Sequence, residues 1–322
     1  MKLILSRKGF DSAAGGVASP ILPGGELRSL PIPDVHSPIR YADIRSAATD
    51  GLGDDGDNPR TAQLVQALTG GRLRGRSRAH LDPDLLAVTL PREPGWRPLF
   101  GQCGAAQGHL ARQAVGAGDL FLFFGWFRAV ERRARRWRYA AAAPDLHLLH
   151  GWLQIGAVVD LATAPPPSWA RYHPHCHGRR GRGNRLYLAA ERLRIDGRDS
   201  GLPGAGVFSH FAAPLKLSAG GARRSLWRLP VAFHPDRRVA ADGADRAPLS
   251  YHERAGRWRR DGEHCWLEAA HRGQEFVLDL RDYADLLPWL SELFACATPG
   301  VASAQDRPRG DGQSSGGDHT ER

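Results

Sequence analysis

Two histidines at residues 173 and 175 offer the residue type best suited to binding a transition metal. In an extended segment, side chains two residues apart point to the same side, so His173 and His175 are expected to face one ion together. Pro174 lies between them, lacks a backbone N–H and disfavours helix, which predicts an extended segment. The sequence therefore predicts half of a site for Fe(II) or Zn(II).

A carboxylate is needed to complete that site. We expect it from Asp11 or Asp119, which would give the two-histidine, one-carboxylate set of non-haem iron or of catalytic zinc. The alternative is that the histidine pair in this Gly- and Arg-rich stretch caps backbone carbonyls or faces water. Elemental analysis of the purified protein would separate the two.

A polar loop after the first expected strand holds two candidate catalytic residues. Lys8 can contact a phosphate, and Asp11 can act as a general base or metal ligand. Gly15 and Gly16 permit tight turns in the same loop. The alternative is an internal ion pair with a turn. The glycine spacing and ending of a P-loop are absent from this loop.

Three polar side chains flank an expected helix start. Gln102, Gln107 and His109 can read a base edge or hold an anion there, and helix capping is the alternative. Arg40, in a proline-rich stretch, and Asn184 are further residues that we expect to contact a nucleotide.

A second polar cluster precedes a late expected strand. Arg272 can clamp a phosphate and Gln274 can contact a base, so we assign Arg272 to nucleotide binding and Gln274 and Glu275 to catalysis. The alternative is a surface pair between Arg272 and Glu275. A serine-hydrolase elbow and an HExxH helix are both missing from the sequence.

The net charge of +10 is carried almost wholly by arginine. Such charge favours phosphate binding. The densest cluster spans residues 132–138, where Trp137 lies among arginines and can stack on a base. A solvated strand and turn is the alternative for that cluster.

The pattern of apolar residues predicts an α+β protein with a mixed β core and a few peripheral helices. We expect helices over residues 61–68, 105–115 and 283–294, where apolar residues recur at helical spacing. Strands are expected over residues 3–5, 120–127, 146–161, 186–190, 215–218, 226–229, 266–269 and 275–280.

Length and composition predict one large domain over residues 1–296 and a disordered tail over 297–322. No apolar run approaches the 18 or so residues of a membrane helix, and the N-terminal apolar stretch is too short for a secretory signal. Four scattered cysteines without a CxxC pair suit reduced thiols. A cytoplasmic protein is therefore expected.

Eight motifs occur in an order that resembles a known family: SRKGFDSAAGG, PIPDVHSPIRY, HLDPDL, FGQCGAAQGHL, GDLFLFFGWFR, HGWLQIG, HPH and RGQEFVLDL. Together they resemble the nucleotide modification associated domain family, third type, over roughly residues 1–295. The resemblance implies a role in modifying nucleotides or nucleic-acid bases and does not imply a particular reaction. The Arg-rich insertion at 131–138 departs from the family pattern.

The central strands carry a second, more distant likeness. GDLFLFFGWF followed by HGWLQIGAV is similar to two strands of the PUA-like barrels, including the ASCH and EVE groups, which cradle nucleotides or RNA. This likeness implies a barrel in the centre of the fold.

Three functions remain open at this point. The first is an enzyme, or an accessory protein, of nucleotide or base modification. The second is a non-catalytic PUA-like reader of modified bases or RNA, walled by aromatic residues and without a metal triad. The third is a metal-dependent enzyme that acts on another substrate.

Overall fold

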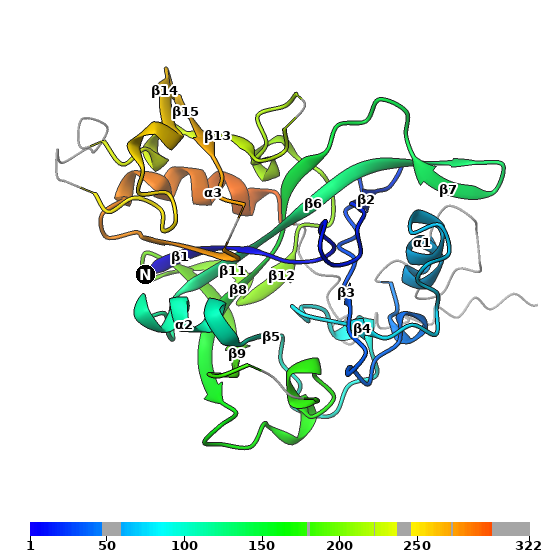
Figure 1. Ribbon diagram of the computed structural model, residues 1–322. Helices are drawn as coiled ribbons and strands as arrows, with labels where there is room; N and C mark the ends of the chain where they lie inside the picture. The colour runs from blue at the N-terminus through cyan, green and yellow to red at the C-terminus, as the bar shows by residue number, and fades with distance from the viewer. Residues whose placement is uncertain (47–58, 179–180, 222, 237–245, 272, 298–322) are drawn as a thin grey trace, which may run out of the picture.

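The computed structural model describes residues 1–46, 59–178, 181–221, 223–236, 246–271 and 273–297. Within these residues, a nine-stranded sheet forms the centre of the molecule (Figure 1). Its main path runs, in order, through β16 (Glu275–Asp279), β1 (Lys2–Arg7), β6 (Leu120–Arg133), β8 (Leu146–Asp160), β9 (Arg185–Ala189) and β5 (Leu99–Gln102). Strands β1 and β6 run parallel, and the other neighbours on this path run antiparallel.

Further strands join this sheet or form small sheets beside it. Off the main path lie β2 (Ser19–Ile21), β7 (Arg136–Tyr139) and β12 (Ala205–Val207). The small sheets pair β3 (Ile32–Pro33) with β4 (Ala79–His80), β10 (Arg192–Ile195) with β11 (Arg198–Pro203), and β13 (Leu226–Pro230) and β14 (Trp258–Asp261) with β15 (His264–Glu268).

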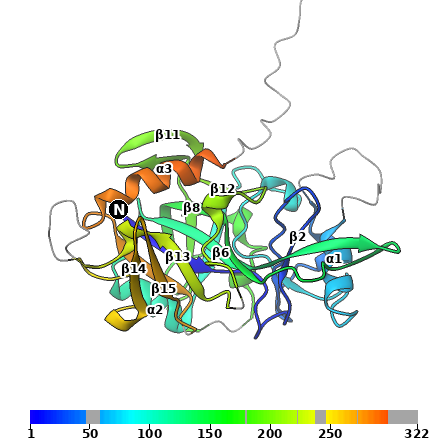
Figure 2. The same ribbon diagram turned by 90° about the horizontal axis from the view of Figure 1, so that it is seen from above.

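Three α-helices lie around the sheet in the part of the chain that the structure describes: α1 (Thr61–Leu68), α2 (Gly104–Arg112) and α3 (Leu287–Ala295). Figures 1 and 2 place α3 near β13–β15 at one end of the molecule and α1 near β7 at the other. The α+β class predicted from the sequence is confirmed. The main path of the sheet is open, so the described residues form no closed barrel, and the PUA-like likeness is not confirmed.

Alternation of side chains along the central strands divides the core into two layers. Leu3 and Leu5 point into a layer that includes Trp227 and Leu290, on the side of β13–β15 and α3. Ile4 points into the other layer, which includes residues of β5, β9 and α2. This division follows from the two-residue period of a strand. A third apolar cluster packs α1 against the loops before it and against β6.

Most of the expected elements are present. The helix at residues 61–68 is confirmed, the one expected at 105–115 ends at Arg112, and the last begins as a 3-10 helix at Ala284–Leu286. The strand expected at 215–218 is wrong, because a 3-10 helix occupies Ala213–Leu215 and only isolated bridges follow. The tail expected at 297–322 lies, beyond Ala297, outside the described residues.

The arginine-rich insertion at residues 131–138 forms the hairpin of β6 and β7. This agrees with the alternative that the arginine cluster is a solvated strand and turn. Arg138 pairs with Glu131 across the hairpin at 2.6 Å, and the half-buried Trp137 packs toward the cluster around α1. Phosphate binding by this hairpin stays a prediction. No described helix has the length and apolar character needed to cross a membrane.

Buried histidines in the core are expected to make the fold sensitive to acid. Burial lowers the pKa of His147 to about 3 and that of His252 to about 4, from an ordinary value of 6.5. The unfolded chain therefore binds protons first, so their stabilising contribution is full above pH 6.5 and is lost as pH falls toward 4 and 3. Urea unfolding should show about 2 kcal/mol lost per histidine between pH 7.5 and pH 5.

A matched variant isolates one of these contributions. His147 Nδ1 accepts a hydrogen bond from the Trp227 indole N–H at 3.0 Å. In His147→Gln the amide oxygen can still accept that bond but does not titrate. The variant should therefore lose less stability than the wild-type protein over the same pH range. An equal loss in both proteins would contradict the assignment.

Candidate metal centre

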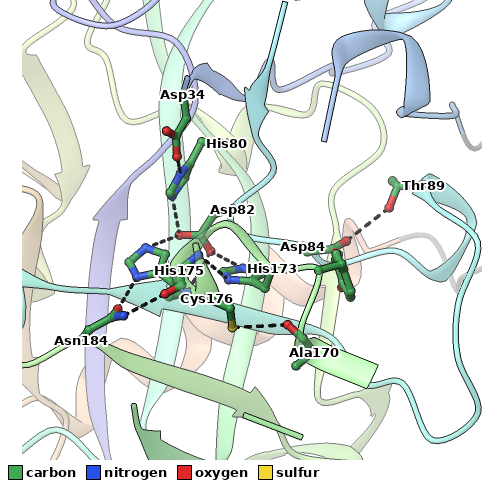
Figure 3. Close-up of polar contacts among 12 residues, drawn as sticks. Asp34, His80, Asp82, Asp84, Thr89, Ala170, His173, His175, Cys176 and Asn184 are labelled. Carbon is green, nitrogen blue, oxygen red and sulfur yellow. Dashed lines mark hydrogen bonds and ion pairs between the residues drawn. The ribbon is translucent and has the colours of Figure 1, made fainter. Parts of the chain in front are cut away.

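Pairing of β3 with β4 brings the first ligand candidate beside an acidic partner. Ile32 lies opposite His80 in this pair, so Asp34, two residues further, comes next to the imidazole. The Asp34 carboxylate lies 2.8 Å from His80 Nδ1. Figure 3 shows these two side chains facing each other. A carboxylate only accepts hydrogen bonds, so Nδ1 carries a proton, and in the neutral ring that a metal ion requires Nε2 presents a lone pair.

The second ligand candidate belongs to a short turn. His173 is the N-cap of the 3-10 helix Pro174–Cys176 (η4), and His175 lies inside it. The extended segment that we predicted here is therefore wrong. Pro174 occupies the first helical position, where its missing N–H is not needed, so it begins the turn and does not prevent it.

Asn184 fixes the orientation of His175. Its amide N–H donates to the His175 carbonyl at 2.8 Å, which turns the amide oxygen toward His175 Nδ1 at 2.6 Å. Nδ1 therefore donates its proton to Asn184, and Nε2 carries the lone pair. Asn184, predicted as a nucleotide contact, acts in the structure as the partner of His175.

The carboxylate of Asp82 lies at the centre of this group (Figure 3). Its Oδ2 is 3.5 Å from His80 Nε2 and also 3.5 Å from His175 Nε2. Its Oδ1 accepts a hydrogen bond from the backbone N–H of Gly101 at 2.9 Å. His80, Asp82 and His175 each offer one ligand atom, and these atoms lie within 4.8 Å of one another.

This arrangement calls for a cation. The two Nε2 lone pairs and the carboxylate oxygen between them are all electron-rich, and both imidazoles already use Nδ1–H elsewhere. Either a proton or a metal ion must lie between them to offset the repulsion. Histidine ligands held by an acceptor on the other ring nitrogen are the usual arrangement at metal centres. We call His80, Asp82 and His175 the metal triad.

His173 has a different position. Its Nδ1 accepts a hydrogen bond from the His175 backbone N–H at 3.3 Å, so its proton is on Nε2. Nε2 faces Asp82 Oδ1 at 3.4 Å. At this distance Nε2 makes no hydrogen bond among the described residues, so His173 lies beside Asp82 with its protonated nitrogen toward the carboxylate and does not offer a lone pair to the ion, although it was predicted as a ligand.

The charges within the group follow from these contacts. Burial opposes ionisation of Asp82, but its contacts with His173, His175 and His80 together hold its pKa well below the usual range. Burial works against a charge on His80, whereas Asp34 and Asp82 outweigh it and raise the His80 pKa. Burial lowers the pKa of His173, which keeps that ring neutral. The triad therefore contains one anionic ligand.

Gly101 on β5 leaves the space that His175 fills. A Cβ atom at this position would lie 2.4 Å from His175 Cδ2. Its backbone N–H also orients Asp82. Strand β5 thus supports two members of the triad through a residue that has no side chain.

The partners of the triad are expected to tune its affinity. In Asp34→Asn the acceptor for His80 loses its charge, and in Asn184→Ala the acceptor for His175 is removed. Each change should weaken Zn(II) binding about 10- to 100-fold, the usual cost of losing such a partner. Competition with a zinc indicator measures this. Asp43→Asn is the control, because Asp43 is exposed and its carboxylate accepts a hydrogen bond from the Arg40 backbone N–H, away from the triad. An equal loss of Zn(II) affinity in this variant would contradict the prediction.

The expected carboxylates, Asp11 and Asp119, lie outside the triad. Asp11 Oδ1 accepts from the backbone N–H groups of Ala13 and Ala14, so it holds its own loop. Asp119 accepts from the backbone N–H groups of Lys2 and Gly116, which ties the start of β6 to β1. The structure gives both residues roles in turns and strand ends.

The sequence analysis did not identify His80 and Asp82 as ligands, and it did not identify Asp34 as the hydrogen-bond partner of His80. The motif HLDPDL contains the signal, because His80 and Asp82 are two residues apart in an extended stretch. That spacing is the one that we used for His173 and His175.

Other predicted residues converge on a second buried cluster. Lys8 Nζ pairs with Glu275 Oε1 at 2.7 Å, and the Gln102 amide donates to the same oxygen at 2.6 Å. Lys8 Nζ also lies 4.7 Å from the centre of the Phe100 ring. Glu275 Oε2 is buried without a hydrogen-bond partner among the described residues. Three residues that are far apart in the sequence thus meet, whereas Asp11 is not part of this cluster.

Gln107 and His109 are held by the protein itself. The Tyr187 hydroxyl donates to Gln107 Oε1 at 2.8 Å, and His109 Nε2 lies 2.9 Å from the Ser250 hydroxyl. Burial lowers the pKa of His109. Both residues therefore contribute to polar contacts between α2 and its neighbours.

Two further predicted residues, Arg40 and Gln274, have described contacts away from the metal triad. Arg40 precedes a 3-10 helix at Tyr41–Asp43, and the Gln274 carbonyl accepts from the Arg7 backbone N–H at 2.8 Å. Arg272 lies outside the described residues. Their predicted roles stay untested.

The fold and the triad define an α+β protein with a two-histidine, one-carboxylate group of the kind that binds a divalent metal. Residues 2–279 match the model of the family described as nucleotide modification associated domain 3, and the chain belongs to that family. Comparison with curated proteins gave no match, and comparison with solved structures gave none either.

Proposed function

We propose that this protein is a metal-dependent enzyme that modifies a nucleotide or a base of a nucleic acid. The observation that supports it most is that His80 and His175, each held through Nδ1, turn their free Nε2 atoms toward the same oxygen of Asp82. The family supports a role associated with nucleotide modification.

The residues of the triad have distinct parts in this proposal. His80 and His175 would supply neutral nitrogen ligands, and Asp82 would supply the one negative charge. Three protein ligands leave further positions for a water or a substrate, as catalytic centres require. A divalent metal bound there would polarise a substrate oxygen or lower the pKa of a bound water.

Two steps test the proposal. Protein purified without chelators, with oxygen excluded, should contain about one Fe or Zn per chain by elemental analysis. The metal-loaded protein is then incubated with nucleotides, DNA and RNA, and mass spectrometry should detect a changed base mass that a chelator abolishes.

Each step has a contrary result. A protein that contains no metal and takes up neither Fe(II) nor Zn(II) would exclude the metal-dependent enzyme. A metal-loaded protein that changes none of these substrates but binds them would contradict catalysis and favour the reader of modified bases or RNA.

A further inference from the structure

A buried polar cluster begins two residues after the carboxylate of the metal triad. Its central residue is Asp84, whose side chain is 0% exposed. The Asp84 backbone N–H donates to the Leu99 carbonyl at 2.9 Å, and the Asp84 carbonyl accepts from the Leu99 N–H at 3.0 Å. Leu99 is the first residue of β5, the strand that supports two members of the triad through Gly101. The backbone of Asp84 is therefore fixed to the strand on which the triad rests.

Tyr172 joins Asp84 to the other half of the triad. It comes three residues before His175, and its hydroxyl lies 2.6 Å from Asp84 Oδ2. The same hydroxyl accepts from Arg92 Nη1 at 2.8 Å and from Trp96 Nε1 at 2.7 Å. A guanidinium and an indole N–H only donate, so the hydroxyl proton is left for the Asp84 carboxylate. This hydrogen bond joins the two segments that carry the triad.

Arg92 holds both partners of that hydrogen bond. Its Nη1 and Nη2 lie 2.7 Å from Asp84 Oδ2 and Oδ1, as in the bidentate pairs that fix a carboxylate in position and orientation. Its Nε and Nη2 also donate to the carbonyls of Ala87 and Leu86, at 2.9 and 2.7 Å. The guanidinium lies over the Trp96 ring, 4.1 Å from the ring centre. With its side chain only 10% exposed, Arg92 is held by contacts on every side.

We propose that Arg92, Asp84 and Tyr172 position His175 against Asp82. The ligand atoms of the triad come from two segments that are far apart in the sequence, and the cluster is attached to each segment within three residues of a ligand. A metal centre needs its ligands held to about 0.5 Å, and the residues that lock them supply that precision. The inference rests on the proposed function in one respect, because it treats the triad as the metal centre.

The first test is the Zn(II) affinity of Tyr172→Phe, measured by competition with a zinc indicator. The variant keeps the ring and loses the hydroxyl that joins the two segments. The affinity should fall about tenfold, the lower end of the usual cost of losing a partner of a ligand, because the cluster acts on the ligands through the backbone. The Co(II)-loaded variant should also have ligand-field absorption bands that differ from those of the wild-type protein, since these bands report the arrangement of the ligands.

Tyr283→Phe is the matched control. Tyr283 is 0% exposed, its hydroxyl donates to the Ala247 carbonyl at 3.0 Å, and the Arg246 guanidinium lies over its ring. It belongs to the core layer of α3, across the sheet from the layer of β5. Both variants lose one buried hydrogen bond, so both should lower the Tm, but only Tyr172→Phe should change the Zn(II) affinity and the Co(II) bands. A Tyr172→Phe protein that is less stable but keeps the wild-type affinity and bands would overturn the proposal.

Arg92→Lys provides a second variant, which decides if Tyr172→Phe does not fold. Lysine keeps a positive charge beside Asp84, so the buried carboxylate is not left without a counter-ion. It lacks the planar fork that binds a carboxylate at two points. The Zn(II) affinity should therefore fall in this variant too. A folded Arg92→Lys protein with the affinity and Co(II) bands of the wild type would count against the positioning role as strongly.

Failure of this inference can be told apart from failure of the proposed function. In the protein without metal, the ring ¹⁵N resonances of His175, assigned with the help of His175→Ala, report how its imidazole lies against Asp82. These resonances should shift in Tyr172→Phe and stay in place in Tyr283→Phe. A wild-type protein that binds no Zn(II) would contradict the metal-dependent enzyme, and the resonances would still decide whether the cluster positions His175. Unshifted resonances and an unchanged Zn(II) affinity in Tyr172→Phe would overturn the positioning role and leave the metal centre supported.

Discussion

His175→Ala and His80→Ala are each expected to reduce the bound metal from about one ion per chain to nearly none. Each change removes a whole ligand, so its effect should exceed the roughly 10- to 100-fold loss caused by removing a partner of a ligand. Two remaining ligands do not hold a divalent ion against a chelator. Elemental analysis after dialysis against a weak chelator measures this result.

Thermal unfolding gives a second readout of the same variants. A metal that binds only the folded state stabilises it by about 2.7 kcal/mol at a concentration of 100 times Kd. Zn(II) should therefore raise the Tm of the wild-type protein and leave that of the two variants unchanged. Without metal, all three should unfold cooperatively, because the triad lies on loops and short strands outside the main core.

His177→Ala is the matched control. His177 belongs to the same stretch, but its Nε2 hydrogen-bonds the Arg171 carbonyl at 2.8 Å and does not face Asp82. Metal content should stay at the wild-type value. Loss of metal in this variant, or retention of it in His175→Ala, would contradict the assignment of the triad.

The sequence predicted the parts of the fold that follow from periodic patterns. The apolar runs in β1 and β6 and the helical spacing in α1 placed these elements correctly, although β6 continues beyond the predicted end to Arg133. The strand predicted at residues 215–218 failed because alternating apolar residues also suit an irregular segment that buries Leu215 and Leu217.

Two of the three triad residues, His80 and Asp82, were missed although they have the same two-residue spacing as His173 and His175. The carboxylate was assigned to Asp11 or Asp119, since local spacing holds no information on which distant segments meet. The pairing of β3 with β4 and the hydrogen bond from Gly101 to Asp82 decide that. Both are contacts between segments that are far apart in the sequence.

Pro174 shows a second limit of the sequence. A proline disfavours the interior of a helix but suits its first position, and the sequence alone did not distinguish the two. The structure places it at the first position of η4. As a result, His173 and His175 do not have equivalent roles, although they are two residues apart.

Lys8→Met is expected to lower the free energy of unfolding by about 3–5 kcal/mol, because it leaves the Glu275 carboxylate buried without its counter-ion. The side chains of Lys8 and Glu275 are 9% and 0% exposed and lie 2.7 Å apart. Urea unfolding at neutral pH measures the loss. In the double variant Lys8→Met/Glu275→Gln, no charge remains buried and the new amide can still accept from Gln102, so part of the stability should return.

The matched control for Lys8 is an exposed pair of almost the same length. Arg138 and Glu131 lie 2.6 Å apart, but their side chains are 47% and 42% exposed. Arg138→Met should cost less than about 1 kcal/mol, since water already screens this pair. The two ion pairs therefore differ in the burial of their side chains, while the distance between the charged atoms is nearly the same. If Lys8→Met cost no more than Arg138→Met, or if the double variant were less stable than Lys8→Met, the pair would not be the buried charge cluster that β1, β5 and β16 enclose.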